Sequence, residues 1–124
     1  MNIINIICVG IGGFIGSICR YLISIYSAKV FTSKISIGTL IVNILGGFLI
    51  GFIMEISIKT DLISPEMKLL LTTGIMGGLT TFSTFSYETI ILIENGNFLF
   101  ALFNIVLNLI LSLVGVSLGK SIIN

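Results

Sequence analysis

Charged and metal-binding side chains are scarce in this sequence of 124 residues. It contains no histidine and no tryptophan, and only 9% of its residues are charged, whereas a soluble domain carries about 25%. Histidine is a principal protein ligand of zinc and haem iron, so its absence argues against a zinc or haem site. The composition therefore excludes an ordinary soluble domain, and we expect neither catalytic residues nor a nucleic-acid partner.

Long apolar runs take the place of the missing charge. Hydrophobic residues make up 56% of the chain, its mean hydropathy is +1.22, and four uncharged runs each approach the ~20 residues that cross a ~30 Å hydrocarbon layer. The first run lacks the basic start and the cleavage site of a signal peptide. We predict an all-α membrane protein with a single domain over residues 1–124. Its four transmembrane segments are expected at about 3–28, 35–57, 66–93 (broken) and 98–120.

Basic residues are divided evenly between the two sides that four crossings would define. One side would hold Lys59, Lys68 and Lys120, and the other Arg20, Lys29 and Lys34. The positive-inside rule therefore has almost nothing to act on. Two arrangements stay open: an antiparallel, dual-topology homodimer, or one orientation fixed by features other than charge.

Pairs of glycines spaced four residues apart occur in every predicted segment. Such pairs let a second helix approach closely. The bundle is therefore expected to be tight, and some of these glycine faces are expected to meet a second subunit. The pairs are Gly12/Gly16, Gly47/Gly51, Gly74/Gly78 and Gly115/Gly119.

Polar residues form stripes along two of the segments. Thr39 and Asn43 share one face of the second segment, and Asn104, Asn108 and Ser112 recur every four residues in the fourth. Isolated polar residues in membrane helices usually form interhelical hydrogen bonds worth about 0.6 kcal/mol. Three aligned positions favour a lined pathway instead.

Carboxylates are absent from the middle of the first, second and fourth segments. Proton-coupled carriers generally need such a group to exchange protons. Glu88 lies close to the end of the third segment, two residues past the stretch 77–86, and its position is typical of an anchor at the membrane interface.

The stretch "GGLTTFSTFS" (77–86) predicts a break in the third segment. Adjacent glycines and β-branched threonines weaken a helix, so half-helices are expected at about 66–76 and 82–93. Broken helices persist at membrane depth only inside protein or along a cavity. The carbonyls of residues 77–80 could hold a cation, or Ser and Thr side chains could satisfy them in a simple kink.

Phe82 and Phe85 stand three residues apart, on one helical face, beside Ser83 and Thr84. The edge of an aromatic ring is electropositive, and hydroxyl and amide groups can replace part of an anion's hydration. The pattern is typical either of an anion path or of ordinary core packing.

Together these motifs resemble the small bacterial fluoride channels of the Fluc (CrcB) family. The resemblance covers essentially the whole chain, and its most specific element is the string at residues 77–88. One departure is Ser17, which stands where the family more often has Ala. The matching strings are "GGFIGSICRY" (12–21), "GTLIVNILGGFLIG" (38–51), "GGLTTFSTFSYE" (77–88) and "ALFNIVLNLILS" (101–112).

The resemblance implies a channel that passively exports cytoplasmic fluoride and confers fluoride resistance. It implies a multi-pass location in the bacterial cytoplasmic (inner) membrane and an antiparallel homodimer with two pores. It further implies a central structural Na⁺ held by the backbone carbonyls of Gly77 and Thr80 from both subunits.

The resemblance also assigns roles to individual side chains. Arg20 would face an aqueous vestibule. The fluoride pathway would comprise Thr39, Asn43, Phe82, Ser83, Thr84 and Phe85, with Asn104, Asn108 and Ser112 in the polar track of the last helix.

Two other functions compete with the channel. A small multidrug-type proton-coupled exporter has a similar length and helix number but needs a carboxylate in the first segment, and usually tryptophan. A non-transporting accessory subunit would use the polar stripes only to hold helices together.

Overall fold

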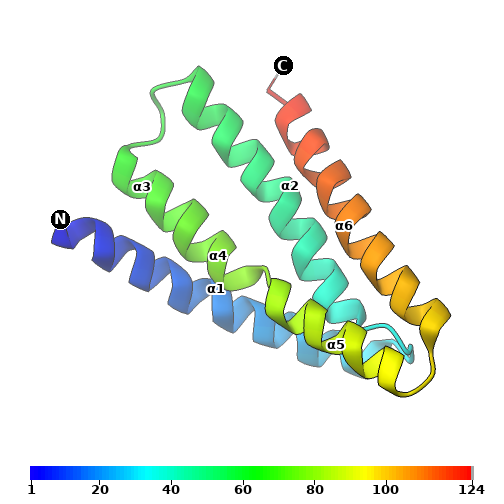
Figure 1. The fold of residues 1–124 in the computed structure, drawn as a ribbon. Coiled ribbons are helices and arrows are strands. Elements are labelled where there is room, and N and C mark those ends of the chain that lie inside the picture. The colour runs from blue at the N-terminus through cyan, green and yellow to red at the C-terminus, as the bar shows by residue number, and fades with distance from the viewer. Residues whose placement is uncertain (124) are drawn as a thin grey trace.

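The computed structural model describes residues 1–123, in which helices are the only regular secondary structure. Both termini and the α2–α3 loop lie towards one end of the molecule, and the α1–α2 and α5–α6 loops lie at the other (Figure 1). This arrangement places successive crossings in opposite directions. The elements are α1 (Ile3–Val30), α2 (Ile37–Lys59), α3 (Pro65–Leu69), η1 (Leu70–Met76), α4 (Gly77–Leu79), α5 (Phe82–Glu94) and α6 (Phe98–Ser121).

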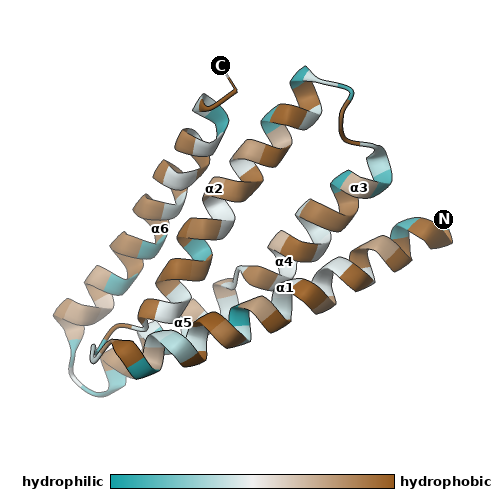
Figure 2. Cartoon of the chain, turned by 180° about the vertical axis from the view of Figure 1, so that it is seen from behind, coloured by the Kyte–Doolittle hydropathy of each residue, from teal (hydrophilic) through white to brown (hydrophobic). Residues whose placement is uncertain are grey.

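Three helices, α1, α2 and α6, are long and apolar enough to cross a membrane. Hydrophobic residues dominate these helices, and hydrophilic residues lie mainly at loops and helix ends (Figure 2). A helix that is apolar on most sides is typical of a membrane span. The predicted all-α membrane fold is confirmed at this level.

The third predicted segment is interrupted at Thr80 and Thr81, inside the expected interval. Thr80 has ψ 158° and Thr81 has φ −151°, so both are extended, and the helix resumes at Phe82. The glycines are not the site of the interruption: Gly77 is helical, with φ −62°. The first half-helix therefore runs to Leu79 instead of ending at residue 76.

A π-helix, η1, precedes the break and was not predicted from the sequence. Its wider turn is visible where the amide of Gly77 donates to the carbonyl of Thr72, five residues back. Such turns are rare and occur frequently at functional sites.

Glycines on α1 and on the broken helix let these two elements cross almost backbone to backbone. A Cβ built on Gly12 would lie 2.8 Å from the Cα of Gly74, and one built on Gly78 would lie 2.6 Å from the carbonyl oxygen of Gly13. On Gly16, a Cβ would collide with the carbonyl of Ile75. No larger residue fits at this crossing.

The α2–α6 contact uses the other four glycines in the same way. Cβ atoms built on Gly47 and Gly51 would meet the carbonyls of Ser112 and Val116, and Gly115 and Gly119 face α2. The glycines of all four predicted pairs therefore contact a neighbouring helix of the same chain. The expectation that some of these faces meet a second subunit is wrong, because the chain's own backbone already covers them.

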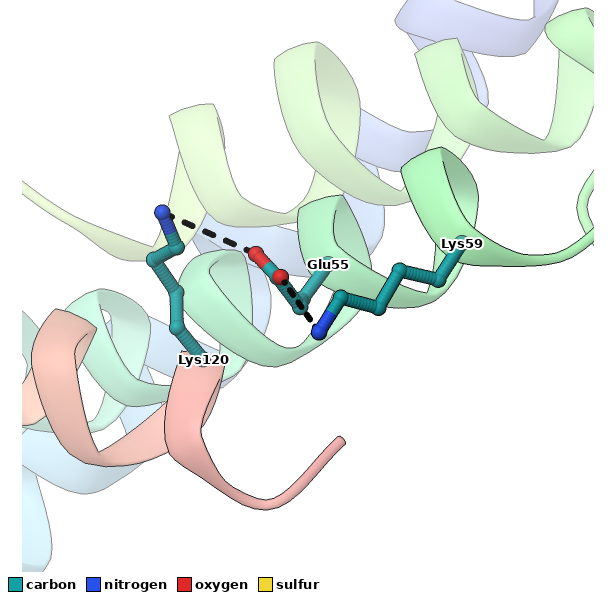
Figure 3. Close-up of polar contacts among 3 residues, drawn as sticks. All are labelled: Glu55, Lys59 and Lys120. Carbon is teal, nitrogen blue, oxygen red and sulfur yellow. Dashed lines mark ion pairs between the residues drawn. The ribbon is translucent and has the colours of Figure 1, made fainter. Parts of the chain in front are cut away.

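An ion-pair cluster fastens the ends of α2 and α6 (Figure 3). The carboxylate of Glu55, a buried residue, lies 3.2 Å from Nζ of Lys59 and 3.6 Å from Nζ of Lys120. Two cations around one shielded carboxylate compensate part of its desolvation.

The substitution Gly16→Ala tests the crossing of α1 with the broken helix. Overpacking at a rigid contact costs about 1–3 kcal/mol, so the thermal unfolding midpoint in detergent should fall by several degrees. Gly10→Ala is the matched control on the same helix, because nothing lies within 4 Å of the added methyl group. Equal midpoints for the two variants would contradict the close crossing.

Candidate functional site

A groove of about 450 Å³ lies where α2, the broken helix and α6 meet. Apolar residues, including Ile50, Met76 and Val116, form much of its lining. The groove therefore combines a few polar groups with an apolar wall. It collects seven residues that the sequence assigned to the pathway or the cation: Asn43, Gly77, Thr80, Phe82, Phe85, Asn108 and Ser112.

The two phenylalanines contact each other edge to face at this groove. Their ring centroids are 5.6 Å apart with an interplanar angle of 60°. Phe85 is 7% exposed, whereas Phe82 is 75% exposed. An exposed phenylalanine beside a buried one is not explained by packing within the chain.

Asn43, which lies on α2, forms hydrogen bonds to the backbone at the break. Its Oδ1 accepts a 2.9 Å hydrogen bond from the amide of Thr81, and its Nδ2 donates to the carbonyl of Thr81 at 3.2 Å. The same Nδ2 donates to Oδ1 of Asn108 at 2.9 Å. Both amide hydrogens of Asn43 therefore have partners inside the chain, a pairing that the helical spacing did not predict.

The hydrogen bonds continue into α6 and α5. Nδ2 of Asn108 donates to the carbonyl and to Oδ1 of Asn104, at 2.9 and 3.1 Å. Nδ2 of Asn104 donates to Oγ1 of Thr89 at 2.9 Å. Thr89 is not among the predicted site residues, although it lies one helical turn beyond Phe85, on the same face.

A second cavity, of about 280 Å³, lies between α1 and the start of α2. It brings together the predicted residues Arg20, Thr39 and Thr84, and adds Ser17 and Ser24, which were not predicted. Thr81 lines both this cavity and the groove. The break therefore separates a polar compartment containing Arg20 from the apolar groove.

Glu88, predicted to be an interfacial anchor, also forms a hydrogen bond to α2. Its Oε1 accepts a 2.8 Å hydrogen bond from the hydroxyl of Thr39, which lies 3.0 Å from the hydroxyl of Ser36. Its Oε2 is buried and has no partner among the described residues. Glu88 is thus linked to a residue of the polar cavity.

Not every predicted pathway residue lies at a cavity. Ser83 is exposed and lines neither cavity, and Asn104 is fully buried. The hydroxyl of Ser112 is buried without a hydrogen-bond partner among the described residues. Only part of the predicted set is therefore placed to contact an ion in these cavities.

The backbone around the break offers oxygen ligands. Within residues 1–123, none of the hydrogen bonds outside the helices ends on the carbonyl of Gly77 or Thr80. In the same residues, no group of three or more acidic, Cys or His side chains could hold a metal. Gly77 is exposed in the groove, with only Thr72 near its missing side chain. A hard cation held by carbonyl oxygens fits this setting.

The amino-acid sequence matches one known protein family. Residues 7–120 match the sequence model of the CrcB-like protein, Camphor Resistance (CrcB) family. A relative from Clostridium perfringens is 60% identical over 114 residues, which are 92% of this chain and 89% of the relative. One from Clostridium novyi is 59% identical over 121 residues, covering 98% and 94%.

A more distant relative, from Shewanella sp. (strain ANA-3), is 49% identical over 119 residues and covers 96% of this chain and 95% of the relative. All three relatives carry the name fluoride-specific ion channel FluC. None of the three is named as an exporter of drugs.

Replacing Asn43 by Asp tests the hydrogen bonds at the break. Asp cannot supply the two amide hydrogens, so the carbonyl of Thr81 and Oδ1 of Asn108 lose their donor. Leaving buried groups unpaired costs about 1–3 kcal/mol, and the unfolding midpoint should drop accordingly.

The matched control is Asn2→Asp, because Asn2 caps α1 with its side-chain oxygen and Asp caps equally well. A midpoint for Asn43→Asp that equals that of the control would show that the break does not depend on the amide.

Proposed function

The chain belongs to the CrcB family, and we propose that it is a fluoride-specific ion channel through which fluoride leaves the cell passively. The observation that supports this most directly is the similarity, over nearly the whole chain, to proteins named fluoride-specific ion channels. It is accompanied by a groove lined by the exposed Phe82. We place the channel in the bacterial cytoplasmic membrane, where it would relieve fluoride toxicity.

The pathway would begin at the polar cavity. Arg20 lines this cavity and would raise the local concentration of anions. The hydroxyl groups of Thr84 and Ser24 supply hydrogen-bond donors that can replace water around a small anion. The hydroxyl of Ser17 already donates to the carbonyl of Gly13 at 2.7 Å. The ion would then pass Thr81, the residue that lines both cavities.

The groove would carry the ion past the phenylalanines. Phe82 and Phe85 meet edge to face, so one ring edge is engaged by the neighbouring ring. The remaining positive edges would face the ion without supplying a full charge. Asn43 acts here by fixing the backbone of Thr81, because its own donors are already engaged. Fluoride is a strong hydrogen-bond acceptor, and the narrow space with hydroxyl donors would favour it over chloride.

A second copy of the chain would complete the groove. Phe82 is 75% exposed, and Gly77 has open space where a side chain would stand. A partner packed here would bury Phe82 and close the wall opposite α6. The even division of basic residues is compatible with an antiparallel partner, which would give two pathways per dimer.

A structural Na⁺ fits between two such chains. The unpaired carbonyls of Gly77 and Thr80 from each copy would hold it, and bound Na⁺ would compensate the oxygen dipoles that the break leaves unpaired. The residues of this chain would supply neutral ligands only, which matches a monovalent ion.

Efflux from liposomes tests the channel against the proton-coupled exporter. Liposomes containing the purified protein and loaded with potassium fluoride should release fluoride only when a potassium ionophore shunts the charge. Release without the ionophore, or proton uptake driven by a cationic drug, would contradict a passive fluoride channel.

Phe82→Ile and Phe85→Ile test the ring edges. Aliphatic side chains lack the positive edge, whose interactions are worth about 0.5–1.5 kcal/mol, so each variant should slow fluoride efflux about three- to tenfold. Phe14→Ile is the control, because Phe14 is exposed on α1 and lines neither cavity. Parental efflux from both groove variants would remove the ring edges from the pathway.

A further inference from the structure

Three buried side chains and one half-buried side chain connect the break in the third segment to the backbone of Phe85. We name Asn43, Asn108, Asn104 and Thr89 the amide relay. It begins at Thr81, which Asn43 binds through both backbone groups. It ends where Oγ1 of Thr89 donates to the carbonyl of Phe85 at 2.8 Å.

The relay is continuous in its hydrogen bonds. Asn43 donates to Oδ1 of Asn108 at 2.9 Å, and Asn108 donates to Oδ1 of Asn104 at 3.1 Å. Asn104 in turn donates to Oγ1 of Thr89 at 2.9 Å. Three helices contribute to it, since Asn43 lies on α2, Thr89 on α5 and the other two on α6. A shift of one member is therefore passed to the next.

Burial makes the partners irreplaceable. Asn104 is 0% exposed, Asn108 4% and Thr89 7%. Water cannot reach these groups to substitute for a lost bond, and an unpaired buried polar group is strongly unfavourable. A threonine that bonds back to the carbonyl four residues earlier also tends to bend its helix, here one turn after Phe85.

We propose that Thr89 and Asn104 are positioning residues that set the place of the Phe85 ring relative to the break. Neither residue lines the groove or the polar cavity, so neither contacts the ion. They act through Phe85 and Thr81, which do line the groove. Given the proposed fluoride conduction, on which this step rests, they tune the fluoride concentration that half-saturates transport.

Thr89→Val and Thr89→Ser separate the hydroxyl from the shape of the side chain. Valine keeps the shape but loses the hydroxyl, so the half-saturating fluoride concentration should rise about threefold or more, with a smaller change in maximal rate. Serine keeps the hydroxyl and should restore the parental value. Thr60→Val is the control, because Thr60 also bonds back four residues, to Ile56, but lies outside the relay.

A spectroscopic measurement tests the positioning without transport. para-Fluorophenylalanine is placed at position 85, and fluorine NMR spectra are recorded in detergent. The resonance should shift or broaden in Thr89→Val and in Asn104→Leu, and return to the parental position in Thr89→Ser. Should Thr89→Val fail to elute at the parental volume in gel filtration, Thr89→Ala takes its place in both measurements.

The outcomes distinguish this inference from the proposed function. A shifted resonance in a protein that does not conduct fluoride would overturn the function and leave the positioning role intact. Parental spectra and parental half-saturation in both the valine and the leucine variants would overturn the positioning role while the channel stands.

Discussion

The hydrogen bonds between the Asn43 side chain and the backbone of Thr81 are the contact on which the site depends. Inside a membrane, backbone groups released from a helix need partners in the protein. One amide side chain satisfies both the N–H and the carbonyl of Thr81. Because Asn43 lies on α2 and binds Asn108 on α6, the same contact joins the break to two spanning helices.

Close helix packing brings these groups within reach. Gly47 and Gly51 let α2 approach α6 so that Asn43 meets Asn108, while Gly12 and Gly16 hold α1 against η1. Gly46 serves the break directly, because any Cβ there would collide with the methyl group of Thr80. These glycines thus serve packing within the chain, whereas Phe82 and Gly77 are exposed at the groove.

The spacing of residues along a single helix predicted those features that depend on one helix alone. It identified the apolar spans, the interval of the break and the shared face of Phe82 and Phe85. It did not predict that Asn43 binds Thr81 or that Asn104 binds Thr89, because such pairs depend on how two helices cross and rotate. Thr89 was detectable from its spacing to Phe85, whereas η1 had no comparable signal. The assignment of the glycine faces was wrong for the same reason: spacing shows that a helix will be approached closely, but not by which neighbour.

The proposed path for fluoride would lead from the polar cavity at Arg20, past the break at Thr81, to the exposed ring of Phe82. Its most direct test is the reversal potential of the purified protein in a planar bilayer, with fluoride and chloride gradients imposed in opposite directions. The current should reverse at the equilibrium potential of fluoride. A reversal at the equilibrium potential of chloride, or no current above that of the bare bilayer, would contradict a fluoride-selective path.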